Sequence, residues 1–192
     1  MRNRPHTALL LCLSLLWPLH GAATLPALAD AASAQIGVTT GYDGRYVRLA
    51  YPGGDVPLHT GVCTDVLIRA YRVLGIDLQQ RVHEDMRRHF AAYPALWGLH
   101  APDRNIDHRR VPNLETYFRR HGKSLRPSGD DADFRPGDIV SWRLPGGLPH
   151  IGIVSPRRNG SRPLIIHNIG NGVREEDVLR AWPIHGHFRY RP

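Results

Sequence analysis

The sequence predicts an α+β fold in which helices pack on an antiparallel sheet, and three observations lead to this prediction. Amphipathic helical patterns occupy the first two thirds of the chain. Short runs rich in Val and Ile, separated by Pro and Gly, follow them. No repeat or long low-complexity linker divides the chain. Helices followed by strands within one domain are typical of the α+β class.

The first residues have the layout of a signal peptide. Residues 1–7 carry two arginines and no acid, residues 8–17 form an apolar run broken by one serine, and Ala27-Leu28-Ala29 provides a small-x-small cleavage site. The apolar run has about ten residues, whereas a membrane-spanning helix needs roughly 20. We therefore expect a leader over residues 1–29, with a second possible cut at Gly21-Ala22-Ala23. The mature protein is expected to be periplasmic or secreted, with no membrane span.

The mature residues 30–192 suit a single domain. Cys63 is the one cysteine among them, so an internal disulfide is impossible even in an oxidising compartment. Loss of the leader's two arginines reduces the 25 basic residues to 23, against 17 acidic ones. This excess favours an anionic partner such as cell wall or lipid head groups. No basic stripe is interleaved with aromatic residues, so we expect no nucleic-acid partner. We also expect a monomer that uses no cofactor.

The helical patterns begin after the leader. Residues 31–36 are expected to begin a helix that runs into Gly37, and the glycine-rich residues 42–55 are typical of a loop. From Cys63 to Leu74 five apolar residues fall on one stripe at i, i+1, i+4, i+7 and i+8, which predicts an amphipathic helix. Gly75 is expected to end it.

Two more helices are expected in the middle of the chain. One spans residues 81–92 and ends before Pro94. The other begins at Pro112, places apolar and aromatic residues on one face, and ends at Gly122.

The last part of the chain is expected to form the sheet. Its strands share β-branched residues bounded by Pro and Gly, and they cover residues 139–142, 151–154, 164–166 and 187–190. Residues 150–154 and 163–168 are expected to form a hairpin around Pro156–Arg162.

Cys63 is the first candidate for chemistry. It stands where a glycine-containing loop enters an amphipathic helix. The start of a helix presents unpaired N–H groups and a partial positive charge, which stabilise a thiolate and can receive an oxyanion. A buried, inert thiol is the competing interpretation.

His150 is the candidate partner of Cys63. A nucleophilic cysteine needs an imidazole that takes its proton and later protonates the leaving amine. His150 opens a strand directly after a Gly-Gly turn, although a solvated turn histidine is also common there. If Val154 opposes Pro163, His150 faces His167, which would orient the imidazole; a slip by one residue would place Asn168 there instead.

These residues carry a resemblance to known families. One set of motifs resembles the second half of NlpC-type cell-wall peptidases, which have a papain-like fold: Arg135–Trp142, His150–Val154 and Ile165–Asn168. A second set resembles the family catalogued as domain of unknown function 1287, which is grouped with the NlpC-like fold: Gln35–Thr39, Gly61–Val66 and Asn105–Leu114. The resemblance covers nearly the whole mature chain. It implies a catalytic order of Cys63, His150 and His167.

The chain departs from the NlpC pattern in two places. Val62 precedes the cysteine where NlpC-type enzymes usually have Asp, and the spacing from Cys63 to His150 implies a helical insertion near residues 76–130.

Four residues are candidate substrate contacts. The insertion holds Asp107-His108-Arg109-Arg110, where His108 and Arg109 are candidates because arginine forks bind carboxylates. A solvated, internally capped loop is the commoner outcome for such a segment. Asp65, close after Cys63, and Asn168, beside His167, are the other two candidates.

A zinc site is not expected. His185 and His187 lie two residues apart on a predicted strand, which puts both imidazoles on one face. No Cys or Glu motif at ligand spacing supports them.

The sequence therefore predicts an exported, thiol-dependent amide hydrolase that acts on peptidoglycan stem peptides. Two alternatives stay open: a lipid-directed acyl hydrolase or transferase of the same fold, and a cell-wall binding protein that has lost its activity.

Overall fold

The computed structural model describes residues 24–191 and confirms the α+β class. Within this range the helices are α1 (Leu25–Ser33), α2 (Cys63–Val73), α3 (Leu78–His89) and α4 (Val111–His121). The strands are β1 (Lys123–Leu125), β2 (Ile139–Arg143), β3 (Pro149–Asn159), β4 (Arg162–Asn168), β5 (Val173–Glu176) and β6 (Ile184–Arg189). Short 3-10 turns lie at Phe90–Ala92, Asp107–Arg109, Asp131–Asp133 and Pro145–Gly147.

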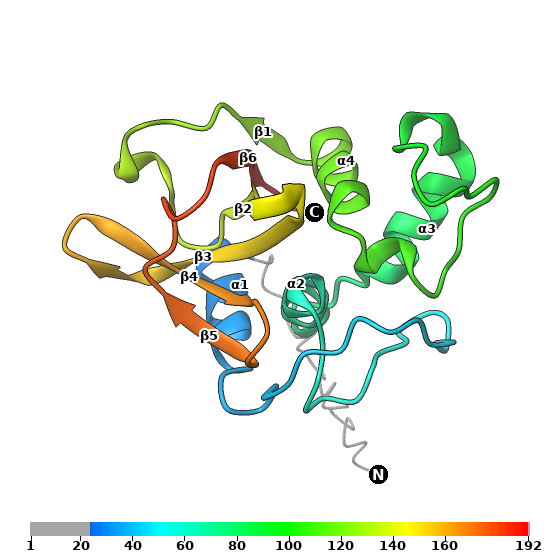
Figure 1. Cartoon of the computed structure of the whole chain (residues 1–192), viewed down its shortest axis with the longest axis horizontal. Coiled ribbons are helices and arrows are strands. Elements are labelled where there is room, and N and C mark those ends of the chain that lie inside the picture. Colours follow the sequence, from blue (N-terminus) through cyan, green and yellow to red (C-terminus); the bar gives the residue numbers. More distant parts are fainter. Residues whose placement is uncertain (1–23, 192) are drawn as a thin grey trace, which may run out of the picture.

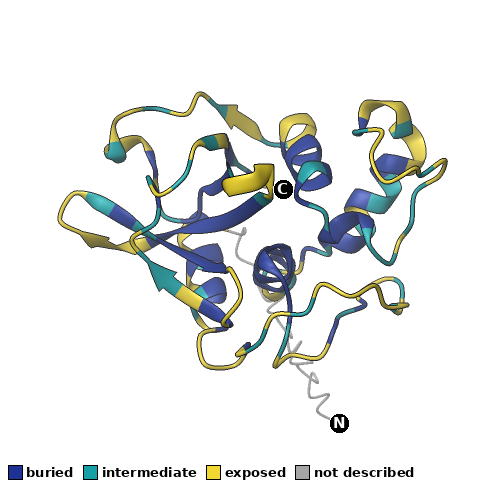
Figure 2. Ribbon diagram, in the orientation of Figure 1, coloured by how far each residue is buried: buried dark blue, intermediate teal, exposed yellow. Residues whose placement is uncertain are grey.

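The strands form one antiparallel sheet with β3 near its centre. The strand order is β1-β6-β2-β3-β4-β5. Helices α1 and α2 pack together and against β3, whereas α4 packs against β1, β3 and β6 and has α3 as its neighbour (Figure 1). Most of α2 and the first half of β3 are buried (Figure 2). Cys63 therefore starts the helix that lies against the middle of the sheet.

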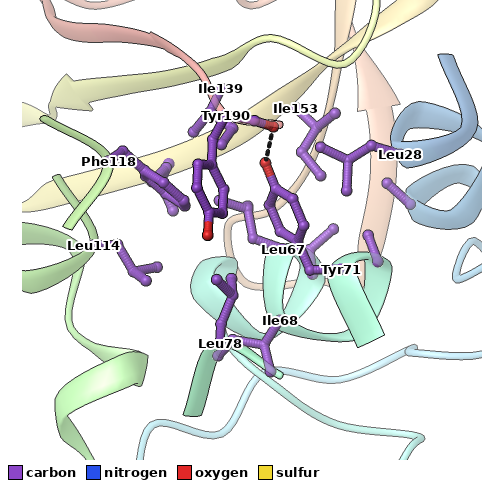
Figure 3. Close-up of a cluster of buried hydrophobic side chains, with 14 of the residues drawn as sticks. Leu28, Leu67, Ile68, Tyr71, Leu78, Leu114, Phe118, Ile139, Ile153 and Tyr190 are labelled. Carbon is purple, nitrogen blue, oxygen red and sulfur yellow. Dashed lines mark hydrogen bonds between the residues drawn. The ribbon is translucent and has the colours of Figure 1, made fainter. Parts of the chain in front are cut away.

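Each face of the sheet has its own apolar core, because successive side chains of a strand point to opposite faces. On the helix side Ile139 and Ile153 meet Leu67 and Tyr71 of α2 (Figure 3). The opposite face is covered by non-helical chain, and its apolar residues are Phe134, Val140, Trp142, Val154, Ile165 and Leu179.

Helix α1 begins earlier than the pattern at 31–36 indicated. Thr24 caps it through a bond from the Ala27 N–H to its side chain, and Leu25, Leu28 and Ala29 are buried. The helix lies directly on Gly137: a Cβ there would stand 2.0 Å from the carbonyl oxygen of Leu25. Gly137 also has φ +82, a conformation that favours glycine. The glycine before Asp138 therefore allows α1 to dock.

The position of α1 bears on the expected leader. A cut after Ala29 falls inside the helix, whereas a cut after Ala23 leaves it whole. The apolar run of residues 8–17 lies outside the described residues. None of the helices described between residues 24 and 191 is long and apolar enough to cross a membrane.

The sheet differs from the expected pattern in two respects. The β3–β4 hairpin is longer than expected, because β3 continues to Asn159 and the chain turns at Gly160–Ser161. The edge strands β1 and β5 were not predicted. The helices expected at 81–92 and from Pro112 correspond to α3, with its following 3-10 turn, and α4.

The irregular segment between α1 and α2, residues 34–62, is held by Arg69. Its buried guanidinium pairs with Asp55, with Nε 3.0 Å from Oδ2. It also donates to the backbone carbonyls of Val56, Pro57 and Thr60. These bonds replace the backbone hydrogen bonds that a helix or strand would supply, so they hold the chain that leads into Cys63 in one conformation.

The burial of α1 predicts that stability depends on whether the chain includes residues 24–29. A protein starting at Asp30 should unfold with a free energy about 3–6 kcal/mol lower than one starting at Thr24, because two buried leucines and Ala29 are lost. Urea unfolding of the two proteins measures this. The exposed-site variant Val73→Ala, made in the longer protein, should change the free energy by less than about 0.5 kcal/mol. Equal stability of the two forms would contradict the assignment of α1 to the core.

Candidate functional site

Cys63 is the first residue of α2, as expected. Val62 before it is extended, and its N–H donates to the Asp65 carboxylate, with N 2.7 Å from Oδ2. The side chain of Cys63 is buried, with 5% of the residue exposed, and it forms part of the wall of a cavity of about 420 Å³. A cavity of this size can hold part of a small ligand.

The thiol of Cys63 is protonated in the resting protein. Burial raises its pKa to about 12, and the nearby Asp65 carboxylate raises it further, against a lowering contribution from the backbone N–H of Ile151. Desolvation disfavours the thiolate more than the start of the helix favours it. The contact with Ile151 places the sulfur beside the start of β3, next to the backbone of the residue that follows His150.

His150 and His167 form a hydrogen-bonded pair. His150 Nε2 lies 2.8 Å from His167 Nδ1, and both rings are buried. The indoles of Trp142 and Trp182 pack around His150 at centroid distances of 5.9 Å. Burial lowers the pKa of His150 to about 3, with His167 as the second cause, so the imidazole is neutral at physiological pH.

The two histidines meet although the predicted register was wrong. Val154 pairs with Ile165, where Pro163 was expected. The shift is two residues, and a shift of two keeps every side chain on its face of the sheet. His150 and His167 therefore share a face, together with Trp142 opposite His150 on β2.

Glu176 completes the row, and the sequence analysis missed it. Its Oε2 lies 2.9 Å from His167 Nε2. Residue 176 belongs to β5, which pairs with β4. Burial lowers the pKa of His167, while Glu176 acts in the opposite direction. The Asn171-Gly172 dipeptide, a common hairpin turn, was the signal that could have revealed this strand.

The carboxylate of Glu176 sets the tautomers of both rings. A carboxylate only accepts, so His167 carries its proton on Nε2 and accepts at Nδ1. His150 then donates through Nε2, which leaves its Nδ1 as the unprotonated nitrogen. The row thus determines at which atom of His150 a proton could be taken up.

The structure places the Cys63 sulfur beside the backbone of Ile151, the residue after His150, and does not bring the Cys63 and His150 side chains together. The hydrogen bonds among residues 24–191 include none between these two side chains. Cys63 lies on the helix side with Ile151, and His150 lies with Trp142 toward the other face. The role of this pair in catalysis remains a prediction.

Asp65 and Arg109 are bound to each other rather than free for a ligand. Arg109 Nε and Nη2 each lie 2.9 Å from one carboxylate oxygen of Asp65, and both side chains are buried. Arg109 also donates to the backbone carbonyls of Asp43 and Arg45. This fork ties the turn at Asp107–Arg109 and the loop near residue 43 to the first turn of α2.

His108 and Asn168 are both buried within the protein. Burial is the main reason why the pKa of His108 falls to about 3, so this ring is neutral within the protein. Asn168 is fully buried on the opposite face from His167, and its Nδ2 donates to the carbonyls of Gly41 and Gly61. Asn168 thus fixes the loop before Cys63 rather than orienting His150.

His185 and His187, the two histidines considered for zinc, contact different residues. His187 is buried, donates to Asp138 at 2.8 Å and stacks on Phe134. His185 is half-exposed and lies 3.7 Å from Glu115. Within residues 24–191, no three or more His, Cys, Asp or Glu side chains are grouped to hold a metal ion.

Comparisons with solved structures give two NlpC proteins of Trichomonas vaginalis. NlpC1 is 19% identical with a TM-score of 0.48 over 88% of this chain, and NlpC2 is 18% identical with a TM-score of 0.48 over 93%. The chain spans 44% and 52% of their lengths, about half of each.

Comparisons of sequence are far more specific. A protein of Escherichia coli K12, described as uncharacterized protein YijF, is 59% identical over 166 residues, which cover 85% of this chain and 80% of that protein. The model of a family described as domain of unknown function (DUF1287) matches residues 29–190. The chain therefore belongs to the DUF1287 family, as its motifs predicted.

Proposed function

We propose that this protein is an exported cysteine hydrolase that cleaves an amide bond in peptidoglycan stem peptides. The observation that carries the proposal is the row of His150, His167 and Glu176, which leaves the Nδ1 of His150 unprotonated. This imidazole follows Pro149, a residue of the cavity wall, and precedes Ile151, whose backbone contacts the Cys63 sulfur. A neutral imidazole with one defined free nitrogen is one part of what general-base activation needs, and the proposal requires that substrate binding bring this nitrogen to the Cys63 thiol.

The reaction would start from a neutral pair. His150 Nδ1 takes the thiol proton as Cys63 Sγ attacks the amide carbonyl, and the backbone N–H of Cys63 donates to the developing oxyanion. The imidazolium then protonates the amine, and the C–N bond breaks to leave a thioester on Cys63. Water, deprotonated by His150, attacks this thioester and releases the acid and the free thiol. His167 holds the imidazole through its hydrogen bond, and Glu176 fixes the tautomer of His167.

The compartment and the charge support a cell-wall substrate. The leader pattern indicates export, and the mature chain has an excess of basic over acidic residues. The wall of the cavity beside Cys63 includes Arg110, which suits an anionic peptide better than an acyl chain; Arg109 in the same wall is already paired with Asp65.

One observation favours a second function. Cys63 is buried and its thiol has a pKa of about 12, which also describes an inert cysteine. A cell-wall binding protein without hydrolytic activity is therefore the alternative.

Loss of the sulfur tests the hydrolase. Mature wild-type protein should convert purified muropeptides to shorter peptides, and Cys63→Ala should reduce the rate by about 10³-fold or more because the nucleophile is gone. Mass spectrometry of the products measures this. Identical product profiles for the two proteins would reject the hydrolase and leave the binding protein.

The neutral state of the pair predicts the pH dependence of alkylation. With a pKa of about 12, the thiolate fraction of Cys63 rises about tenfold per pH unit between pH 7 and 9.5, and so should the rate of carboxamidomethylation by iodoacetamide. Free cysteine, with a pKa near 8.5, should level off over the same range. A fast rate that does not change between pH 6 and 8 would indicate a thiolate–imidazolium pair and contradict the neutral one.

Glu176 should matter through the tautomer of His167. Glu176→Gln should reduce kcat/KM roughly 10–100-fold, because an amide can donate to His167 Nε2 and favour the wrong tautomer. Glu84→Gln on α3 is the matched control and should leave kcat/KM unchanged. Equal kinetics of the Glu176 variant and wild type would remove Glu176 from the row.

A further inference from the structure

A second cavity adjoins the one beside Cys63. The two have volumes of about 420 and 490 Å³, and both have Trp97, Pro112 and Pro149 in their walls. We call these two cavities together the Trp97 groove. It leads from Cys63 past Trp97 toward Arg119 on α4. Most of its walls come from the segment between α3 and β1, outside the motifs that resemble NlpC-type peptidases.

Trp97 is held in a conformation that a bulky residue rarely adopts. Its φ is +61, in the left-handed region, and 49% of the residue is exposed. The Arg110 guanidinium stacks on its ring, with Cζ 4.0 Å from the centroid. Backbone strain persists where the surrounding structure enforces it, and it gathers at ligand sites. An exposed, strained indole between two cavities is therefore placed to contact a ligand.

Arg110 is incompletely neutralised. Its ion-pair partner among the described residues is Asp107, through one contact of 3.4 Å between Nη1 and Oδ1. Burial raises the pKa of Asp107 to about 6 and lowers the pKa of Arg110, and Asp103 is a second carboxylate, outside ion-pair distance, that favours the charged guanidinium. The neighbouring Arg109 is already neutralised by Asp65. A carboxylate arriving from the cavity would supply the charge that Arg110 lacks.

The second cavity adds one further cation. Arg119 lies in its wall and has no ion pair among the described residues, whereas Arg143 is paired at 2.8 Å with Glu115, the one acidic residue of this wall. A peptide that bears carboxylates fits this charge, and a neutral or cationic peptide does not.

We propose that the Trp97 groove binds acidic peptides, with a peptide carboxylate on the Arg110 guanidinium and the chain running over the Trp97 ring toward Arg119. The link to cell-wall stem peptides, which carry free carboxylates, rests on the proposed function. The groove would then select the substrate, while Cys63 lies in the wall of its first cavity.

Binding to the Cys63→Ala protein separates recognition from cleavage. Isothermal titration with a stem tetrapeptide that has free carboxylates should give a Kd at least about tenfold lower than with the same peptide fully amidated. Arg110→Gln should weaken binding of the acidic peptide about tenfold and remove this preference. Arg88→Gln, an exposed arginine of α3 outside the groove, should have no effect.

Trp97→Gly gives a second test, with a variant that is expected to fold. Glycine relieves the positive φ, so the thermal midpoint should stay level or rise while acidic-peptide binding weakens several-fold. Equal binding of acidic and amidated peptides, equal effects of the Arg110 and Arg88 variants, or no peptide binding at all would overturn the groove as a peptide site. Charge-dependent binding without any Cys63-dependent cleavage would keep the groove and reject the hydrolase.

Discussion

Two buried arginines, Arg69 and Arg109, hold the chain that leads into Cys63. The chain from residue 34 to residue 62 contains no helix or strand, yet it delivers Cys63 to the sheet. Arg69 donates hydrogen bonds to backbone carbonyls near the end of this segment. Arg109 donates to the carbonyl of Asp43 and forms an ion pair with Asp65. Long loops without secondary structure are uncommon in compact domains, and those that persist are functional. Here charged side chains supply the missing backbone partners.

Burial favours the uncharged form of both Cys63 and His150. It raises the pKa of the Cys63 thiol and lowers the pKa of His150, so both groups rest uncharged. An ion pair of the papain type is not the resting state that such an environment favours. Charge would appear only as a substrate is attacked, and the hydrogen bonds that receive it already run from His150 through His167 to Glu176.

Much of the fold could be predicted from periodicity, and the parts that escaped have physical reasons. The stripe from Cys63 to Leu74 gave α2 because nothing in that stretch competes with helical spacing. Helix α1 was placed late because its first residues also fit the cleavage pattern of a leader. The prediction that His150 meets His167 held although the register was wrong, because a shift of two residues keeps both side chains on the same face of the sheet. Glu176 escaped because β5 is a short, charged edge strand without an alternating apolar pattern.

The candidate substrate contacts show a different limit. Asp65, His108, Arg109 and Asn168 were chosen by chemical type alone. Sequence does not reveal that Asp65 and Arg109 satisfy each other, or that Asn168 binds two loop carbonyls. Arg110, adjacent to Arg109 in the sequence, has the looser partner.

The docking of α1 on Gly137 would couple removal of the expected leader to folding. Leu25 touches a residue more than a hundred positions later, so the contact forms only when these distant parts of the chain have come together. Before that, residues 25–30 would be open to a peptidase; afterwards the side chains of Leu28 and Ala29 are buried. If the expected leader is removed, the order of these two events would decide which cut is made, and a late peptidase would reach only the stretch ahead of the helix.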